Sequence, residues 1–139
     1  MRQWVYNPHT GGVTVPDAVR RRTEERIQAY AREHYAGAFN RIEVRFRGAH
    51  CYIDAYTEPE DPSPQPLQSL GETREEHLAR LRAVPVHLCR LRYFGDEDRW
   101  SMAFYTYSNE RYEPSFFNTG EMQGTPEEAF ETAAVYLRR

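Results

Sequence analysis

Alternating apolar and polar residues indicate four β-strands in the middle of the chain. Residues 41–47 and 50–56 alternate with the period of a strand, and Gly48 between them is typical of a tight hairpin turn. Residues 86–94 and 99–107 alternate in the same way and are joined by a short polar loop that starts with glycine. The pattern therefore predicts two β-hairpins.

Helix signals flank these strands. Pro16 and Asp17 open the first helix, which ends near Gly37, because proline is tolerated at the first helical position and glycine commonly follows a helix end. A Thr-x-x-Glu capping box at Thr73 predicts a short helix that ends before Pro85. A second capping box at Thr125, followed directly by proline, predicts a terminal helix with an alanine-rich apolar stripe.

These elements predict one α+β domain that spans residues 1–139. We expect an antiparallel sheet of four to six strands, with the N- and C-terminal helices packed on one face. Residues 4–6, 13–15 and 115–117 are candidates for further short strands. Prolines and acidic residues at 57–71 predict a surface loop.

Composition narrows the class of protein. The chain is 40% apolar and 28% charged and has no long apolar run, so we expect a cytoplasmic globular protein with no membrane partner. A net charge of -3 argues against nucleic-acid binding by bulk electrostatics, although all 18 basic residues are arginines, which suit carboxylates and phosphates. Cys51 and Cys89 lie in apolar strands, which favours reduced core thiols over a disulfide.

No motif assigns a catalytic or metal centre. The sequence lacks a Gly-x-Ser-x-Gly elbow, a His-Glu-x-x-His helix, a phosphate-binding glycine loop and a dinucleotide fingerprint. His50, Cys51, His87 and Cys89 are candidate zinc ligands. However, His50 and Cys51 are adjacent and point to opposite faces of a strand unless a bulge intervenes. We therefore expect no metal ion and no cofactor.

Five segments resemble a family of small bacterial proteins to which no activity is assigned. The likeness covers most of the chain and implies no catalytic residue. The segments are Arg45–Gly48, Cys51–Thr57, Leu91–Trp100, Tyr105–Glu110 and Gly124–Phe130.

The last third of the chain is similar to HicB-like antitoxin domains. It has a hairpin, then Gly124–Ala129, then an alanine-rich helix, although it lacks the Pro-Asp-Leu stretch typical of those domains. This resemblance implies a regulator that binds nucleic acid.

The polar side of the predicted sheet carries the candidate site. If the alternation holds, Ile42, Val44 and Phe46 face a core, and the opposite side is rich in guanidinium and phenol groups. On the third strand the same rule places His87 on the side of Cys89, away from the arginines. The candidate residues, which we call the Arg/Tyr face, are Arg45, Arg47, Tyr52, Asp54, Tyr56, Arg90, Arg92, Tyr105 and Tyr107.

The Arg/Tyr face favours a non-catalytic binding or interaction module over an enzyme. Arginine and tyrosine are common at protein interfaces, so the partner would be another protein or a second copy of the chain, in a homodimer. The same groups can stack on bases and pair with phosphates, which makes single-stranded nucleic acid another candidate partner. An alternative is a small enzyme with a pocket at Asp54, Tyr52 and a neighbouring arginine. These residues can also simply cover a half-exposed sheet.

Overall fold

The computed structural model describes residues 10–60 and 71–137 of the chain. The candidate strand at 4–6 and most of the expected loop at 57–71 lie outside these residues. The elements in chain order are α1 (Asp17–Tyr35), β1 (Arg41–Arg47), β2 (His50–Tyr56), α3 (Arg74–Arg82), β3 (Val86–Tyr93), β4 (Trp100–Thr106), β5 (Arg111–Ser115), α4 (Pro126–Ala133) and the 3-10 turn η1 (Ala134–Leu137).

The five strands form one antiparallel sheet in the order β1-β2-β3-β4-β5, which is also their order in the chain. The two predicted hairpins are therefore present, and β5 extends the second hairpin into a meander. An α+β fold with an antiparallel sheet is confirmed. The hairpin turn between β1 and β2 pairs Arg47 with His50.

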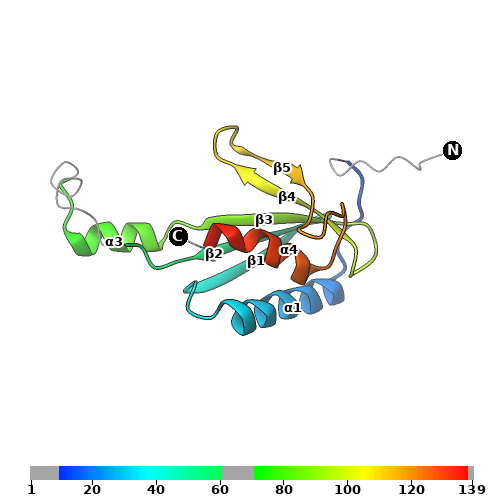
Figure 1. Cartoon of the computed structure of the whole chain (residues 1–139), viewed down its shortest axis with the longest axis horizontal. Helices are drawn as coiled ribbons and strands as arrows, with labels where there is room; N and C mark the ends of the chain where they lie inside the picture. The colour runs from blue at the N-terminus through cyan, green and yellow to red at the C-terminus, as the bar shows by residue number, and fades with distance from the viewer. Residues whose placement is uncertain (1–9, 61–70, 138–139) are drawn as a thin grey trace.

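Helices α1 and α4 cover one face of the sheet (Figure 1). Burial of their apolar stripes explains why both helices form on this side. Ile27 of α1 and Phe130 of α4 are fully buried against the apolar side of the strands, where Trp100 is also fully buried. Ile42 is buried, and Val44 and Phe46 pack against the same core, as the alternation predicts.

Helix α3 projects beyond the end of the sheet (Figure 1). The capping box at Thr73 forms as predicted, with the Thr73 hydroxyl accepting from the Glu76 amide at 3.1 Å. At the other end of α3, the Arg82 guanidinium donates to the Glu58 carboxylate, with a shortest distance of 2.6 Å. This ion pair links α3 to the chain that follows β2.

Two expectations about short strands were wrong. The last strand is β5 at Arg111–Ser115, not 115–117, and Phe117 instead fills the core at 2% exposure. Residues 13–15 are not a strand, although the Val13 amide donates to the Tyr93 carbonyl at 3.0 Å. Glycine is required beside this contact, because a Cβ on Gly12 would lie 2.8 Å from the same carbonyl.

Cys51 and Cys89 are free thiols buried in the core. Burial in apolar surroundings raises the pKa of both thiols, so both stay protonated and poorly nucleophilic. Of the helices in the described ranges, none combines the length and apolarity needed to cross a membrane.

Candidate functional site

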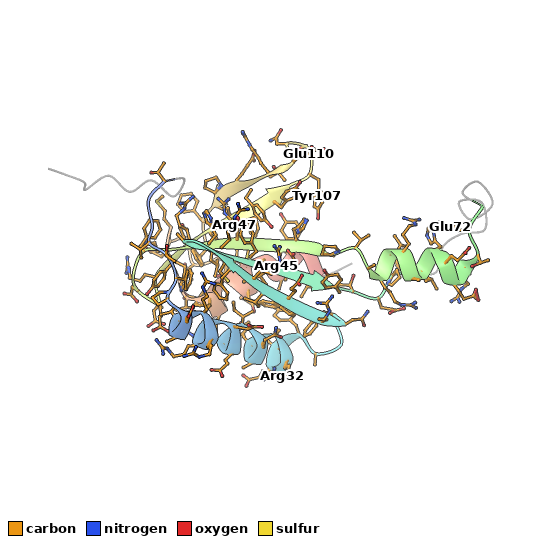
Figure 2. The ribbon with its side chains drawn as sticks, turned by 180° about the vertical axis from the view of Figure 1, so that it is seen from behind. Arg32, Arg45, Arg47, Glu72, Tyr107 and Glu110 are labelled. Carbon is orange, nitrogen blue, oxygen red and sulfur yellow. The ribbon has the colours of Figure 1, made fainter. Side chains whose placement is uncertain are left out.

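The Arg/Tyr face lies on the side of the sheet opposite α1 and α4. Strand register places its members together: Arg45 pairs with Tyr52, and Tyr52 pairs in turn with Arg90. Figure 2 shows Arg47 and Tyr107 on the side of the sheet away from Arg32, which lies on α1. The predicted separation of apolar and polar sides therefore holds for these residues.

The sheet curves toward this face. The rings of Tyr52 on β2 and Tyr112 on β5 have centroids only 5.6 Å apart. In a flat sheet, three strand spacings of roughly 5 Å would separate β2 from β5. The curvature and the inward lean of the two rings therefore close part of this face without a covering helix.

A hollow of about 710 Å³ occupies the concave centre of the face. Every strand of the sheet contributes to its wall, and the wall combines cationic and aromatic groups. The lining residues are Arg45, Phe46, Arg47, Tyr52, His87, Tyr105 and Tyr112.

Asp54 is the buried acid of this face, with 2% of its surface exposed. Arg45 Nη2 donates to Asp54 Oδ2 at 2.8 Å, and His87 Nδ1 lies 2.9 Å from Asp54 Oδ1. Both carboxylate oxygens therefore have a donor, as a buried charge requires. Arg45 also lies over the Tyr52 ring, 5.2 Å from its centroid.

A β-bulge brings His87 to Asp54, which corrects the predicted orientation of this histidine. Ile53 pairs with Cys89 while Asp54 pairs with His87, so Leu88 is the extra residue in β3. The extra residue turns His87 to the open face and leaves Leu88 fully buried. A sequence prediction that counts alternate residues back from Arg90 places His87 on the core side, because it does not include the extra residue.

The contact with Asp54 fixes the proton on the His87 ring. A carboxylate only accepts hydrogen bonds, so Nδ1 carries the proton in the neutral ring and Nε2 is the acceptor. The Tyr105 ring lies 4.9 Å from the His87 ring, and the Tyr107 ring stacks on it at 6.2 Å. His87 is therefore oriented by a carboxylate and surrounded by tyrosines.

Positive charge remains on the face after the Arg45–Asp54 pair is counted. Arg47 and Arg90 have no acidic partner among the residues that the structure describes. The Arg90 guanidinium lies over the Tyr112 ring, 5.2 Å from its centroid. These two cations are available to an anionic ligand.

Burial and charge shift the pKa values of His50 and Tyr112. Burial, assisted by the charges of Arg90 and Arg92, lowers the pKa of His50 from 6.5 to about 4, so this ring is neutral at pH 7. Burial and the nearby Asp54 carboxylate raise the pKa of Tyr112, which keeps its hydroxyl protonated.

Five predicted members of the face do not line the hollow: Asp54 and Arg90, which contact residues of its wall, and Tyr56, Arg92 and Tyr107, which lie away from it. The Tyr56 hydroxyl donates to Glu43 at 3.3 Å. The Arg92 guanidinium donates to the Gly11 carbonyl at 2.7 Å and so ties the N-terminal segment to the sheet. Tyr107 is 63% exposed and lines a second hollow. The structure therefore concentrates the site around Asp54 and adds His87 and Tyr112, which the sequence pattern did not select.

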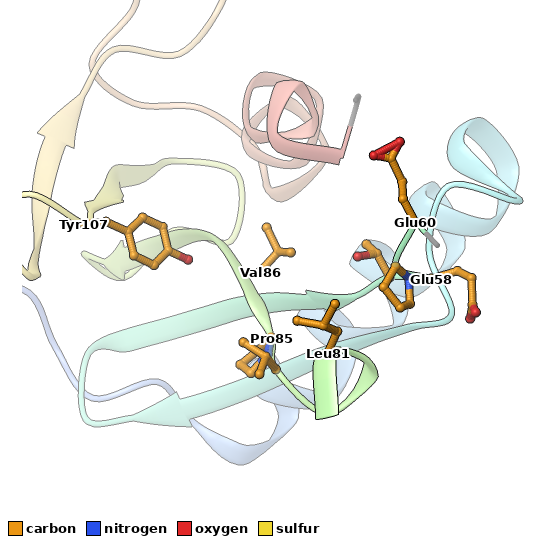
Figure 3. Close-up of a pocket in the computed structure, with 9 residues that line it drawn as sticks. Glu58, Glu60, Leu81, Pro85, Val86 and Tyr107 are labelled. Atoms are coloured by element: carbon orange, nitrogen blue, oxygen red, sulfur yellow. The ribbon is translucent and has the colours of Figure 1, made fainter. Parts of the chain in front are cut away.

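The second hollow lies beside the base of α3 and has a volume of about 420 Å³ (Figure 3). Its labelled wall combines Leu81, Pro85 and Val86 with the acidic residues Glu58 and Glu60. Its wall lacks the arginines of the first hollow, although the Tyr107 ring in this wall stacks on His87 of the first. An anion would therefore favour the hollow at Asp54.

Within the described ranges, no group of three or more His, Cys, Asp or Glu side chains could hold a metal ion. The candidate zinc ligands His87 and Cys89, which alternation placed on one side of β3, lie on opposite sides because of the bulge at Leu88. Cys51 and Cys89 point into the core, whereas His87 points to the open face.

No protein-family model, curated protein or solved structure matches this chain. The similarity to HicB-like antitoxin domains therefore stays a prediction.

Proposed function

We propose that the protein is a binding module that holds single-stranded nucleic acid on its Arg/Tyr face. The observation that carries the proposal is the hollow at Asp54, where Arg47, which has no acidic partner among the described residues, and three partly exposed tyrosine rings line one concave surface. Arginine side chains can pair with phosphates, and tyrosine rings can stack on bases.

The cations supply the phosphate contacts. Arg47 and Arg90 lie on either side of the β2 strand, and neither has an acidic partner among the described residues. Arg45 differs from them because it is committed to Asp54. Two free guanidinium groups suit a short stretch of phosphate backbone rather than a duplex bound by bulk charge, which agrees with the acidic net charge of the chain.

The rings supply the stacking surface. Tyr52, Tyr105 and Tyr112 form a contiguous aromatic cluster, with neighbouring centroids 5.2 to 5.6 Å apart. Stacking on aromatic side chains tolerates any base, so this surface supports binding with little sequence preference.

Binding to a labelled oligothymidylate of about 12 nucleotides tests the proposal by fluorescence anisotropy. We expect Arg47→Ala and Arg90→Ala each to weaken binding by about tenfold, the effect of removing one charged hydrogen bond. The dependence of affinity on salt should also become shallower, by about 0.7 in logarithmic slope for each phosphate that the variant no longer neutralises.

Arg32→Ala is the matched control, because Arg32 is exposed on α1 and its substitution removes the same charge far from the hollow. It should leave the affinity unchanged. Equal effects of all three substitutions would overturn the proposal, and so would an absence of binding at low salt. A stable homodimer in sedimentation that is broken by Arg47→Ala or Arg90→Ala would favour self-association through this face instead.

A further inference from the structure

We propose that His87 is a general base that takes the 2′-hydroxyl proton of RNA bound on the Arg/Tyr face, so that the protein cleaves single-stranded RNA. This inference rests on the proposed function and adds a reaction to it.

The Asp54 carboxylate holds the His87 ring in the orientation that a base requires. Arg45 anchors one carboxylate oxygen at 2.8 Å, and the other lies 2.9 Å from Nδ1 of His87. The proton on Nδ1 leaves the lone pair on Nε2. A neutral imidazole held in this way by a carboxylate is the arrangement that general bases use.

The Nε2 atom is accessible from the hollow. The His87 side chain is 29% exposed and lines the wall, whereas Asp54 behind it is almost completely covered. Among the described residues, the structure gives Nε2 no hydrogen-bond partner. A hydroxyl group in the hollow can therefore donate to Nε2.

The cations near His87 favour a phosphodiester as the group that is attacked. Arg90 and His87 both lie against the Tyr112 ring, at 5.2 and 6.4 Å from its centroid, and Arg47 lines the same hollow as His87. Cations therefore lie near the base. RNA places a hydroxyl beside each phosphodiester, which is the pairing of groups that this geometry suits. Charge that develops on the phosphate oxygens would be stabilised by Arg90 and Arg47.

The step balances without a further reactant. The ribose 2′-hydroxyl gives its proton to Nε2 of His87, and its oxygen forms a bond to the adjacent phosphorus. The bond between phosphorus and the 5′-oxygen breaks, and its electron pair leaves with that oxygen, which takes a proton from water. His87 then returns its proton to the resulting hydroxide. The products are a 2′,3′-cyclic phosphate and a 5′-hydroxyl.

Incubation of the full chain with labelled oligouridylate in EDTA tests this reaction. We expect cleavage that leaves 2′,3′-cyclic phosphate ends, whereas oligothymidylate, which lacks the 2′-hydroxyl, is bound but not cut. His87→Gln, purified in the same way, should lower the cleavage rate by about 10²- to 10⁴-fold and lower oligothymidylate affinity far less, because Arg47 and Arg90 supply the phosphate contacts.

Asp54→Asn tests the positioning role of the carboxylate. Arg45 can only donate, so the amide oxygen must face Arg45 and the amide nitrogen must face Nδ1 of His87. The neutral ring then carries its proton on Nε2 and cannot accept one from RNA. Cleavage should fall although His87 is present, and oligothymidylate affinity should persist.

The outcomes separate the two proposals. Binding of both oligonucleotides without cleavage overturns the reaction and leaves the binding function standing. Cleavage that His87→Gln does not slow identifies a different source of activity and also overturns the reaction. Failure to bind either oligonucleotide overturns both proposals.

Discussion

The two faces of the sheet achieve burial by different means. The face under α1 and α4 is covered by helices, and its largest side chains, such as Trp100 and Phe130, are apolar and completely buried. On the Arg/Tyr face the side chains of the strands themselves cover Asp54, which is almost as inaccessible. A curved sheet can therefore bury a charge on its open side, provided that every oxygen has a donor.

This difference separates what holds the protein together from what is available to a ligand. Apolar burial stabilises the helix-covered face in proportion to area and needs no particular geometry. The open face depends on a few directional contacts, which contribute less stability but present charge and rings to the solvent. Substitutions on the helix-covered face should therefore mainly lower stability, whereas substitutions on the open face should mainly lower ligand affinity.

Phe130→Ala should have the largest effect on stability. The Phe130 ring is fully buried between α1 and the sheet and lies 5.7 Å from the Tyr35 ring, so its removal leaves a cavity. We expect the free energy of unfolding to fall by about 3–5 kcal/mol in urea denaturation. Oligothymidylate affinity should be preserved under conditions where the variant is folded. A decrease below about 1 kcal/mol would show that α4 is not firmly packed on this face.

Asp54→Ala should have an intermediate effect. It removes the acceptor for Arg45 and His87, but both of these side chains are partly exposed and can be solvated. We therefore expect the free energy of unfolding to fall by about 1.5–3 kcal/mol, less than for Phe130→Ala. Unchanged stability would mean that the contacts of Asp54 do not stabilise the fold, and that stability comes from the helix-covered face.

His50→Asn should change how stability depends on pH. Burial and the nearby arginines hold the pKa of His50 near 4 in the folded chain, below its usual 6.5. The unfolded chain therefore binds a proton first, and stability decreases as the pH falls from about 6.5 to about 4. Because the ring is partly exposed, we expect a decrease of about 1–2 kcal/mol across this window.

The comparison of wild type with His50→Asn isolates this effect from the carboxylates that titrate in the same window. The variant should lose less stability between the two pH values in urea denaturation. Parallel curves for the two proteins would contradict the buried position of His50 beside Arg90 and Arg92.

Sequence patterns predicted the helix-covered face well, because its determinants are local. The capping box at Thr125 forms at the start of α4, and Ile42 marks the buried side of β1. Each of these signals depends on residues within one turn or one strand, so no knowledge of the tertiary arrangement is needed.

The centre of the open face could not be predicted in the same way. His87 reaches Asp54 only because Leu88 interrupts the alternation of β3, and no residue type marks that bulge. Tyr112 lies in β5, a polar edge strand that contains Pro114 and has no apolar alternation to reveal it. Curvature then brings Tyr112 to Tyr52, and this is a property of the whole sheet rather than of any segment.

The Leu88 bulge gives β3 one residue more than β2 needs between Arg90 and His87. Without this extra residue, regular pairing would still place His87 opposite Asp54, so Leu88 adds buried apolar surface to the core while the imidazole stays on the open face. A strand can therefore gain one core residue through a single inserted codon while the groups on its other face keep their partners.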